Sequence, residues 1–564
     1  MEYTGDEIAV VGLAGRFPGA ADVPELWRAL RDGVDAVHDH TDDELRALGL
    51  RPELIADPAL VRGHGRLDGV ADFDARFFGV PDDEAAAMDP QQRLFLEQSW
   101  VALQDAGVDP ARDERAVGVF AGASPNRYFL FRLLEQDPAA DWEARLATRW
   151  SPDYLPTQVA YRLGLTGPAV AVQTACSSSL VAVCTAAQSL LDFRCDLALA
   201  GGVSVTEPRF RHTEGGLVSP DGRCRAFDAA GQGSGFGNGV AVFVLARLED
   251  ALEHGDRVHA VLRGWAVNND GADRAGFAAP GLAGQAGVVT EALAGARIDP
   301  ASIGMVEAHG SGTPVGDALE VAALTRAYRA AGDTRTEACA LGSVKANLGN
   351  LDAAAGAAGL VKAVLAVRAG VVPATPHHQE PNPDLNLPAT PFFVPVKTVD
   401  WPSDARPRRA GVSSFGLGGT NAHVIVEEAP APAPRPPATG PFLLAVSART
   451  PDALRDLADR LADHLDTDDH DADGPPRLDD VARTLATGRA AEPHRAIVPC
   501  TDHATAVAGL RRVAAGDPPP VDGPAAAWVG GADVDLFVDP AGARVVPLPH
   551  HPLRPVRHWI EVGS

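Results

Sequence analysis

The stretch PAVAVQTACSSSLVAVCTAAQSLL, residues 168–191, holds the change of pattern that decides the fold. PAVAVQTA (168–175) is a short run of β-branched and small residues, which predicts a buried strand. SSSLVAVCTAAQSLL (177–191) follows without a linker and predicts a helix. A strand that passes directly into a helix is typical of an α/β fold, and Cys176 stands at the junction.

The same alternation continues on both sides of this stretch. IAVVGLAG (8–15), AVGVFAGA (116–123) and LALAGGVSV (197–205) predict further buried strands. Asp89-Pro90 predicts the start of a helix, because Asp is a good N-cap and Pro is favoured at the first helical position. We therefore expect residues 1–428 to form one α/β domain.

Three further segments follow this domain. Residues 429–441 are rich in Pro and Ala and predict a stiff, solvated linker. Residues 442–516 alternate strand-like and helix-like runs and predict a small α/β unit. Residues 517–564 are rich in Pro and end in VVPLPHHPLRPVRHWIEVGS. Such a tail cannot fold alone, so we expect it to pack against the body.

Charge and composition exclude several classes of protein. The 564 residues include 49 Lys and Arg against 75 Asp and Glu, a net charge of −26, whereas a nucleic-acid or anionic-membrane binder needs a positive surface. The N-terminus lacks the features of a signal peptide, and no apolar run approaches the roughly 20 residues of a membrane span. Six cysteines without metal spacing fit a reduced, cytoplasmic protein without structural zinc.

Two residues are candidates for covalent and acid–base chemistry. Cys176 begins a predicted helix, where the dipole and free N–H groups lower a thiol pKa and make it nucleophilic; the alternative is a small core residue. His309, in VEAHGSGTPVGD, ends a predicted strand in a loop of small residues, as an active-site base often does. The alternative interpretation of His309 is a histidine with a purely structural role.

Lys345 and two glycine-rich segments are weaker candidates. Lys345, in GSVKANLGN, is one of three lysines in a chain that otherwise uses Arg, and its alternative role is a buried ion-pair partner. The segment GVSSFGLGGTNAH (411–423) either points backbone N–H groups into a cavity or makes a sharp strand connection. GQGSGFGNG (231–239) does not match GxGxxG, and no GxxxxGK[ST] occurs, so a nucleotide site is unsupported.

Seven motifs carry a resemblance to a known family. ACSSSL, EAHGSGTPVGD, GSVKANLGN and SSFGLGGTNAH, joined by GRFPG, MDPQQRLFLE and SPDGRCRAFD, resemble the ketosynthase domains of modular type I polyketide synthases over residues 6–428. This resemblance implies the thiolase fold, which is a five-layer α/β/α/β/α sandwich built from two similar βαβαβαββ halves. It also implies that two copies of the chain form a homodimer. It also implies that a small α/β linker subdomain follows and that the tail LPHHPLRPVRHWIE wraps back onto the ketosynthase.

The resemblance implies a role for each candidate residue. Cys176 would take an acyl chain from the phosphopantetheine of an upstream acyl carrier protein, and the N–H groups of Cys176 and Leu417 would form the oxyanion hole. His309 would promote decarboxylation of a malonyl group on a second carrier protein, and Lys345 would organise the pocket electrostatically. A gate to the pocket would consist of Phe415, Gly416, Leu417 and Gly418. The thiol chemistry needs no directly bound cofactor and no metal.

The resemblance also extends to one subfamily. No GxSxG nucleophile elbow occurs, and the small unit runs straight into the wrap-around tail, as in synthases served by a separate acyltransferase acting in trans. FDAAGQGSGFGNGV also looks like those systems. The two ends of the chain suggest a piece of a larger synthase.

Asn350 is the departure that matters most. The family pattern after N-[IL]-G is His, and in elongating members this His donates a hydrogen bond to the malonyl thioester carbonyl. Losing one such donor costs about 10²–10³ in rate, although Asn retains an N–H donor. Acylation of Cys176 does not need this group, so the chain resembles a non-elongating ketosynthase. Leu417 stands where the family has Phe, which loosens the expected gate.

Three functions are therefore considered. The first is an acyl-transferring, non-condensing ketosynthase; the second is a fully condensing one; the third is a scaffold that only docks carrier proteins. Retention of Cys176, His309 and Lys345 argues against the scaffold. A thiolase using free coenzyme A is weaker still, because no second Cys lies in residues 416–423.

Overall fold

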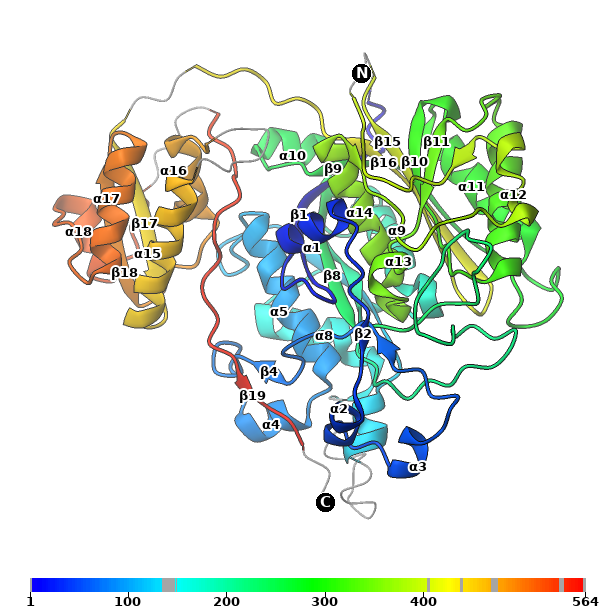
Figure 1. Ribbon diagram of the computed structural model, residues 1–564. Coiled ribbons are helices and arrows are strands. Elements are labelled where there is room, and N and C mark those ends of the chain that lie inside the picture. The colour runs from blue at the N-terminus through cyan, green and yellow to red at the C-terminus, as the bar shows by residue number, and fades with distance from the viewer. Residues whose placement is uncertain are drawn as a thin grey trace.

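The computed structural model describes residues 3–133, 148, 150–402, 406–436, 440–467, 475–536 and 542–560. Residues 8–247 contain a βαβαβαββ unit (Figure 1). Its elements are β1 (Ile8–Arg16), α5 (Pro90–Asp105), β5 (Val117–Ala123), α8 (Leu155–Leu163), β6 (Ala169–Ala171), α9 (Ser178–Leu191), β7 (Leu197–Ser204) and β8 (Gly239–Arg247). The strand order is β1-β8-β7-β5-β6, in which β1, β8 and β7 are antiparallel and β7, β5 and β6 are parallel.

Residues 260–428 repeat this unit. The elements are β9 (Ala260–Asn269), α11 (Leu282–Ala296), β10 (Ile303–Glu307), α12 (Pro314–Ala330), β11 (Cys339–Gly342), α14 (Ala355–Ala369), β15 (Arg409–Phe415) and β16 (Thr420–Glu428). Their order is β9-β16-β15-β10-β11, with the same parallel and antiparallel pairs in the same places. β13 (Phe392–Phe393) extends the far edge, and β1 pairs with β9 to join the halves. The predicted duplication is confirmed.

The helices complete five layers. α5 and α8 cover the outer face of the first half-sheet, and α11 and α12 lie over the outer side of the second half. α9 and α14 lie between the halves, and each contacts strands of both. Both central helices are apolar on nearly every side, which is the pattern of a helix enclosed by protein all round. Gly356 permits their close approach, because a Cβ there would lie 2.7 Å from the Leu180 Cβ.

Short elements occupy the connections. They are α1 (Val23–Arg31), β2 (His38–Asp39), α2 (Asp42–Ala47), α3 (Pro52–Ile55), β3 (Gly63–His64), β4 (Asp72–Phe73), α4 (Asp82–Ala87), α10 (Leu248–His254), α13 (Lys345–Leu348), β12 (Val371–Val372) and β14 (Val399–Asp400). Asp89 caps α5 as predicted, since its carboxylate accepts the Gln91 N–H.

One strand expectation needs correction. The segment PAVAVQTA was predicted to be a buried strand, but only Ala169–Ala171 form β6, and Val170 is 40% exposed. β6 is the outermost strand of the sheet, so one edge has no neighbour within the described chain. Apolar composition alone did not distinguish a central strand from an edge strand.

A small α/β unit follows the second half (left side of Figure 1). It consists of β17 (Phe442–Ala448), α15 (Pro451–Asp466), α16 (Leu478–Thr487), β18 (His494–Cys500) and α17 (His503–Ala514), with β17 and β18 antiparallel. The structure adds a helix, α18 (Gly523–Val529), within the stretch expected to be tail. It contacts β18, and Trp528 is buried among the apolar residues there.

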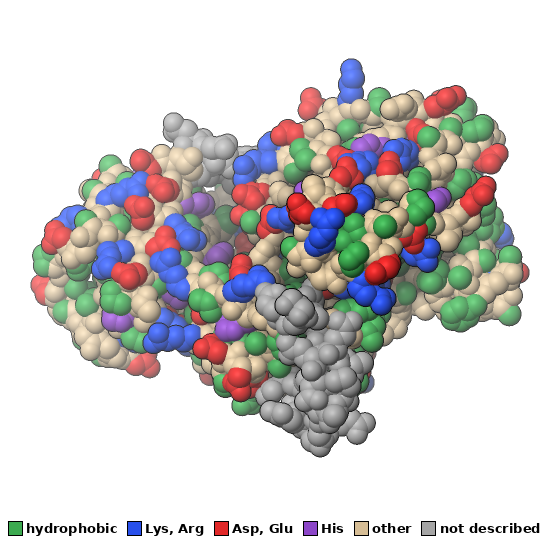
Figure 2. Space-filling model, turned by 60° about the horizontal axis from the view of Figure 1, so that its bottom comes forward, with side chains coloured by type: hydrophobic (Ala, Val, Ile, Leu, Met, Phe, Trp, Pro, Cys, Tyr) green, Lys and Arg blue, Asp and Glu red, His purple; other side chains and the backbone are tan. Residues whose placement is uncertain are grey.

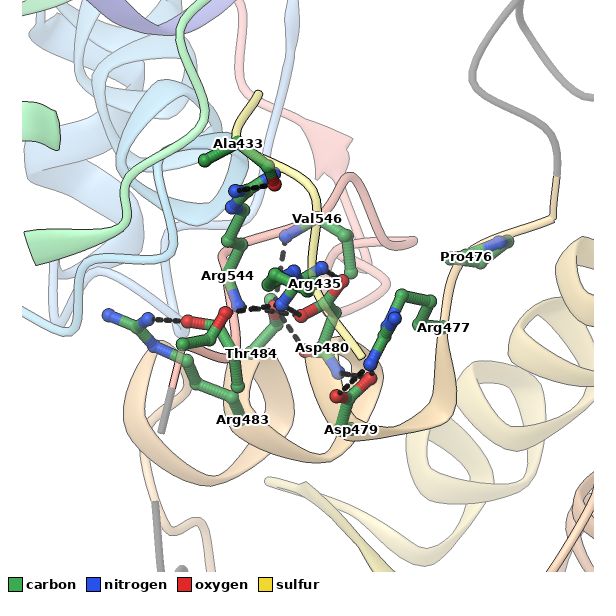
Figure 3. Close-up of polar contacts among 12 residues, drawn as sticks. Ala433, Arg435, Pro476, Arg477, Asp479, Asp480, Arg483, Thr484, Arg544 and Val546 are labelled. Atoms are coloured by element: carbon green, nitrogen blue, oxygen red, sulfur yellow. Dashed lines mark hydrogen bonds and ion pairs between the residues drawn. The ribbon is translucent and has the colours of Figure 1, made fainter. Parts of the chain in front are cut away.

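The linker, the tail and α16 are tied together at Asp480 (Figure 3). The buried Asp480 carboxylate accepts hydrogen bonds from Arg435 at 2.7 and 2.6 Å and from the Arg544 backbone N–H at 2.6 Å. Beyond this point the tail returns to the body, where β19 (Val556–Arg557) pairs with β4 and Arg93 binds the His558 carbonyl at 2.6 Å.

The face of the molecule in Figure 2 carries charged side chains of both signs. On the face in Figure 2, basic side chains lie among acidic ones rather than in one continuous field. Among the described residues, no helix combines the length and apolarity needed to cross a bilayer.

Candidate active site

Cys176 lies in a tight 3₁₀ turn, Ala175–Ser177 (η3), between β6 and α9. Ala175 has a φ of 56°, a left-handed conformation that a non-glycine residue adopts only when its surroundings impose it. The following serines supply those surroundings. The Ser178 hydroxyl accepts the Thr174 N–H at 2.9 Å and donates to the Ala175 carbonyl at 2.7 Å. This turn is a tight elbow at the predicted strand-to-helix junction, and it holds the partly buried thiol at the entry to the central helix.

His309 lies in the loop that leaves the end of β10. Its N–H and that of Gly310 donate to the buried Glu320 carboxylate of α12 at 2.7 and 2.8 Å. The Phe415 N–H donates to His309 Nδ1 at 3.2 Å, so in the neutral ring the proton is on Nε2. Burial and the neighbouring Lys345 charge lower the His309 pKa well below its usual value of 6.5. The imidazole is thus a neutral hydrogen-bond donor rather than a base.

Lys345 begins α13 and is buried. Its ammonium donates to the His309 carbonyl oxygen at 2.5 Å. Its charge also interacts with the carboxyl groups of Asp317 and Glu320, whose pKa values burial raises to about 7. Lys345 is thus buried near two carboxyl groups and holds the backbone of the His309 loop through one hydrogen bond.

Asn350 approaches the thiol directly. Its Nδ2 lies 3.8 Å from Cys176 Sγ, and its Oδ1 accepts the Asp352 backbone N–H at 3.1 Å, which orients the amide. The Asn350 backbone is held by the glycine run, because its N–H donates to Gly235 and its carbonyl accepts from Gly237. The run that did not match a nucleotide motif therefore packs against the Asn350 loop.

The predicted direction of the Cys176 pKa is wrong for this structure. Burial raises the thiol pKa to about 11, and the nearby Asp352 carboxylate contributes in the same direction, outweighing the opposing effects of Lys345 and Asn350. Asp352 Oδ1 lies 3.8 Å from Cys176 Sγ. With this pKa, Cys176 carries a thiol and not a thiolate at neutral pH.

The glycine-rich turn between β15 and β16 lies against the elbow. A Cβ on Gly416 would lie 2.1 Å from the Thr174 carbonyl oxygen, so only glycine fits there. Leu417 is 44% exposed, and its N–H has no acceptor among the described residues. Gly418 is partly buried with open space around it, and the Phe415 ring lies 5.6 Å from the His309 ring.

One strand connects the two sides of the site. The Ser414 hydroxyl donates to the Cys176 carbonyl at 2.9 Å, and the next residue, Phe415, donates to His309. The structure therefore brings Cys176 and Asn350 into direct contact and links His309 to them through β15.

Sequence reasoning missed Ser414 and Asp352. The only signal for Asp352 in the sequence is an acidic residue two positions after Asn350.

No metal is indicated at this site. Within the described ranges, no group of three or more His, Cys, Asp or Glu side chains is arranged to hold a metal ion. The arrangement offers a thiol in contact with a carboxylate and an amide donor, together with a neutral imidazole that is linked to them through β15.

Comparison with known proteins agrees with the fold and the motifs. Residues 5–251 match the β-ketoacyl synthase N-terminal domain, 259–379 its C-terminal domain, and 381–496 the ketoacyl-synthetase C-terminal extension. Ketosynthase twelve of the bacillaene polyketide synthase from Bacillus amyloliquefaciens superimposes with a TM-score of 0.87 at 35% identity, covering 99% of this chain and 100% of that one. The oxazolomycin ketosynthase domain OzmH KS7 of Streptomyces albus JA3453 gives 0.86 at 35% identity, with 98% of both chains covered.

Among the curated relatives is a phenolphthiocerol/phthiocerol polyketide synthase protein of Mycobacterium tuberculosis, 46% identical over 504 residues, or 87% of this chain. The chain spans about a third of the length of that relative, 34%. The fold and the elbow cysteine place the molecule in the class of thiolase-fold ketosynthases. The chain belongs to the β-ketoacyl synthase family, as a ketosynthase domain of the modular polyketide synthase type.

Proposed function

We propose that this ketosynthase is a non-elongating member that passes an acyl chain between carrier proteins without adding carbons. Cys176 accepts the chain from the phosphopantetheine thiol of an upstream acyl carrier protein and releases it to the thiol of a downstream one. The observation that carries the proposal is Asn350, whose amide approaches the Cys176 thiol from the position where the family pattern has His.

Acylation and condensation make different demands on this site. Acylation develops an oxyanion beside the N–H groups of Cys176 and Leu417, and the unengaged Leu417 N–H supports this assignment. Condensation also places negative charge on a malonyl thioester oxygen, on the side of His309 and Asn350. A neutral amide tied to the Asp352 N–H has little freedom to follow that charge, and it cannot transfer a proton.

The condensing alternative rests on one observation. His309 is neutral with its proton on Nε2, so it can donate one hydrogen bond to a malonyl carbonyl. Under this alternative, a single donor from His309 and a second from Asn350 would suffice for decarboxylation.

The partners follow from the same proposal. The exposed edge of β6 supports a homodimer, in which a second copy would cover Val170. The small α/β unit runs into the returning tail with no GxSxG motif between them, which supports a separate acyltransferase acting in trans. We assign residues 1–428 to the ketosynthase domain, 429–441 to the linker, 442–516 to the linker subdomain and 517–564 to the tail. Phe415, Gly416, Leu417 and Gly418 form the gate.

The test follows the mass of Cys176 and the release of carbon dioxide. Incubation with an acyl N-acetylcysteamine thioester should add one acyl mass, which Cys176→Ala abolishes, and a downstream carrier protein should then remove it. Malonyl carrier protein should release little or no carbon dioxide. Asn350→His should raise that release about 10-fold or more, whereas Asn350→Ala, the matched control, should not. Efficient chain extension by the unmodified protein would establish the condensing alternative instead.

A further inference from the structure

Asp352 and Cys176 meet because the two halves of the fold repeat. Asp352 lies in the 3₁₀ turn Asp352–Ala354 (η5) that precedes α14, as Ala175 lies in η3 before α9. Both residues have a positive φ, 46° and 56°, although neither is glycine. Since α9 and α14 pack together in the central layer, their entry turns η3 and η5 are in contact. A carboxylate is thereby fixed against the nucleophile by backbone geometry.

We propose that Asp352 is a catalytic residue, the general base that takes the Cys176 thiol proton during acylation and returns it to the leaving thiol. This inference rests on the acyl-transfer function proposed above. It assigns to Asp352 the proton transfer that both acylation and release require.

The contacts around the thiol leave one proton acceptor among the described residues. His309 Nδ1 already accepts the Phe415 N–H, so Nε2 carries a proton and cannot take another. Asn350 presents its NH₂ group to the sulfur, and Lys345 is a donor engaged with the His309 carbonyl. The Asp352 carboxylate, 3.8 Å from Sγ, is the acceptor that the thiol hydrogen faces.

The surrounding charges are compatible with this role. Lys345, from α13, stabilises negative charge on Cys176 and so opposes Asp352. Arg127, from the loop after β5, interacts with the Asp352 carboxylate and with Glu207. Burial and Asp352 together keep the sulfur protonated at rest, with a pKa of about 11, so attack on a thioester needs a base to remove the proton as the bond forms.

In each acyl transfer, the proton that leaves one thiol is returned to the other. The Cys176 S–H bond breaks as Sγ bonds to the acyl carbonyl carbon, and the proton passes to Asp352 Oδ1. Collapse of the tetrahedral intermediate breaks the bond to the pantetheine sulfur, and that thiolate takes the proton from Asp352. Release to the downstream carrier protein runs the same steps in reverse, with the incoming thiol as the proton source.

Two rates measured on the unmodified protein against pH test the proposal without a variant. Alkylation of Cys176 by iodoacetamide requires free thiolate, so its rate should rise about 10-fold per pH unit from pH 7 to 9. Acylation by an acyl N-acetylcysteamine thioester uses the thiol and the Asp352 carboxylate together, so its rate should change less than about 3-fold over the same range. Parallel rises of both rates would overturn the proposal, because they would show that preformed thiolate is the attacking species.

Replacing Asp352 tests the proposal further, because alkylation and acylation of Cys176 should change in opposite directions. Asp352→Asn should speed alkylation at pH 7.5, because the carboxylate no longer disfavours thiolate, and yet slow acylation about 100-fold. Glu207→Gln, which changes a nearby carboxylate outside the site, should alter neither rate. Unchanged or faster acylation in Asp352→Asn would overturn the proposal. Chain extension by the unmodified protein would defeat only the non-elongating assignment, whereas absence of any acylation would defeat both.

Discussion

Replacing Lys362 with Met should destabilise the ketosynthase body through a single buried charge. Lys362, on α14, forms an ion pair with Glu307 at the end of β10, with Nζ and Oε2 at 2.8 Å and both side chains buried. Glu307 also accepts the Val344 N–H at 2.6 Å, directly before Lys345. Removing Lys362 leaves the Glu307 charge without a counter-ion in the core, which costs about 3–5 kcal/mol.

The size of the effect can be stated as a melting temperature. An unfolding entropy of about 2.1 cal/mol/K per residue, over roughly 425 residues, is about 0.9 kcal/mol/K, so the melting temperature should fall by about 3–6 °C. Differential scanning calorimetry measures this shift at constant protein concentration. Acylation of Cys176 should also slow, because Glu307 supports the strand end and the backbone beside Lys345.

The matched control removes both charges. Lys362→Met combined with Glu307→Gln keeps an oxygen acceptor for the Val344 N–H and leaves no unpaired charge, so it should recover at least half of the lost stability. A loss below about 1 °C in the single variant, or an equal loss in single and double variants, would refute the reasoning from the buried charge.

Two further predictions concern the segments around the site. Asp480→Ala should cost about 1.5–3 kcal/mol and make the linker more susceptible to limited proteolysis, because three hydrogen bonds from Arg435 and Arg544 end on this carboxylate. Asp479→Ala, which loses an ion pair with the partly exposed Arg477, should cost less; equal proteolysis of both variants would contradict the role of Asp480. Val170→Asp, on the exposed edge of β6, should convert the expected dimer to monomer by light scattering, whereas Val399→Thr on β14, in a separate two-stranded sheet, should not. A Val170→Asp variant that stayed dimeric would place the interface elsewhere.

Much of the fold was predictable because its signals are local. The apolar runs of β1, β5 and β7, the Asp89-Pro90 cap of α5 and the strand-to-helix change at Cys176 each arise from interactions within a few residues. The motif order then implied the duplicated sandwich, and the pairing of the two half-sheets confirms it. α18 was missed, because its short GPAAAWV sequence is helical only where Trp528 packs against the small α/β unit.

The electrostatics of the site was less predictable. The predicted helix N-terminus at Cys176 indicates a lowered thiol pKa through the helix dipole. The sequence does not show which groups surround the sulfur in the folded protein. Burial and the Asp352 carboxylate reverse that direction, and Asp352 is 176 residues away along the chain. The loop of small residues around His309 likewise predicts a base, whereas its Phe415 N–H partner and its burial are both long-range effects that the sequence does not show.

The family, the duplicated α/β architecture and the candidate residues Cys176, His309, Lys345 and Asn350 can therefore be inferred from the amino-acid sequence. These depend on local propensity and on motifs that each lie within one short segment. Tertiary structure alone decided how those segments meet: which nitrogen of His309 holds the proton, where the Asn350 amide points, and that Asp352 faces the thiol. The reason is physical, because protonation and hydrogen bonding depend on burial and on neighbours within a few ångströms, which chain folding brings together from distant parts of the sequence.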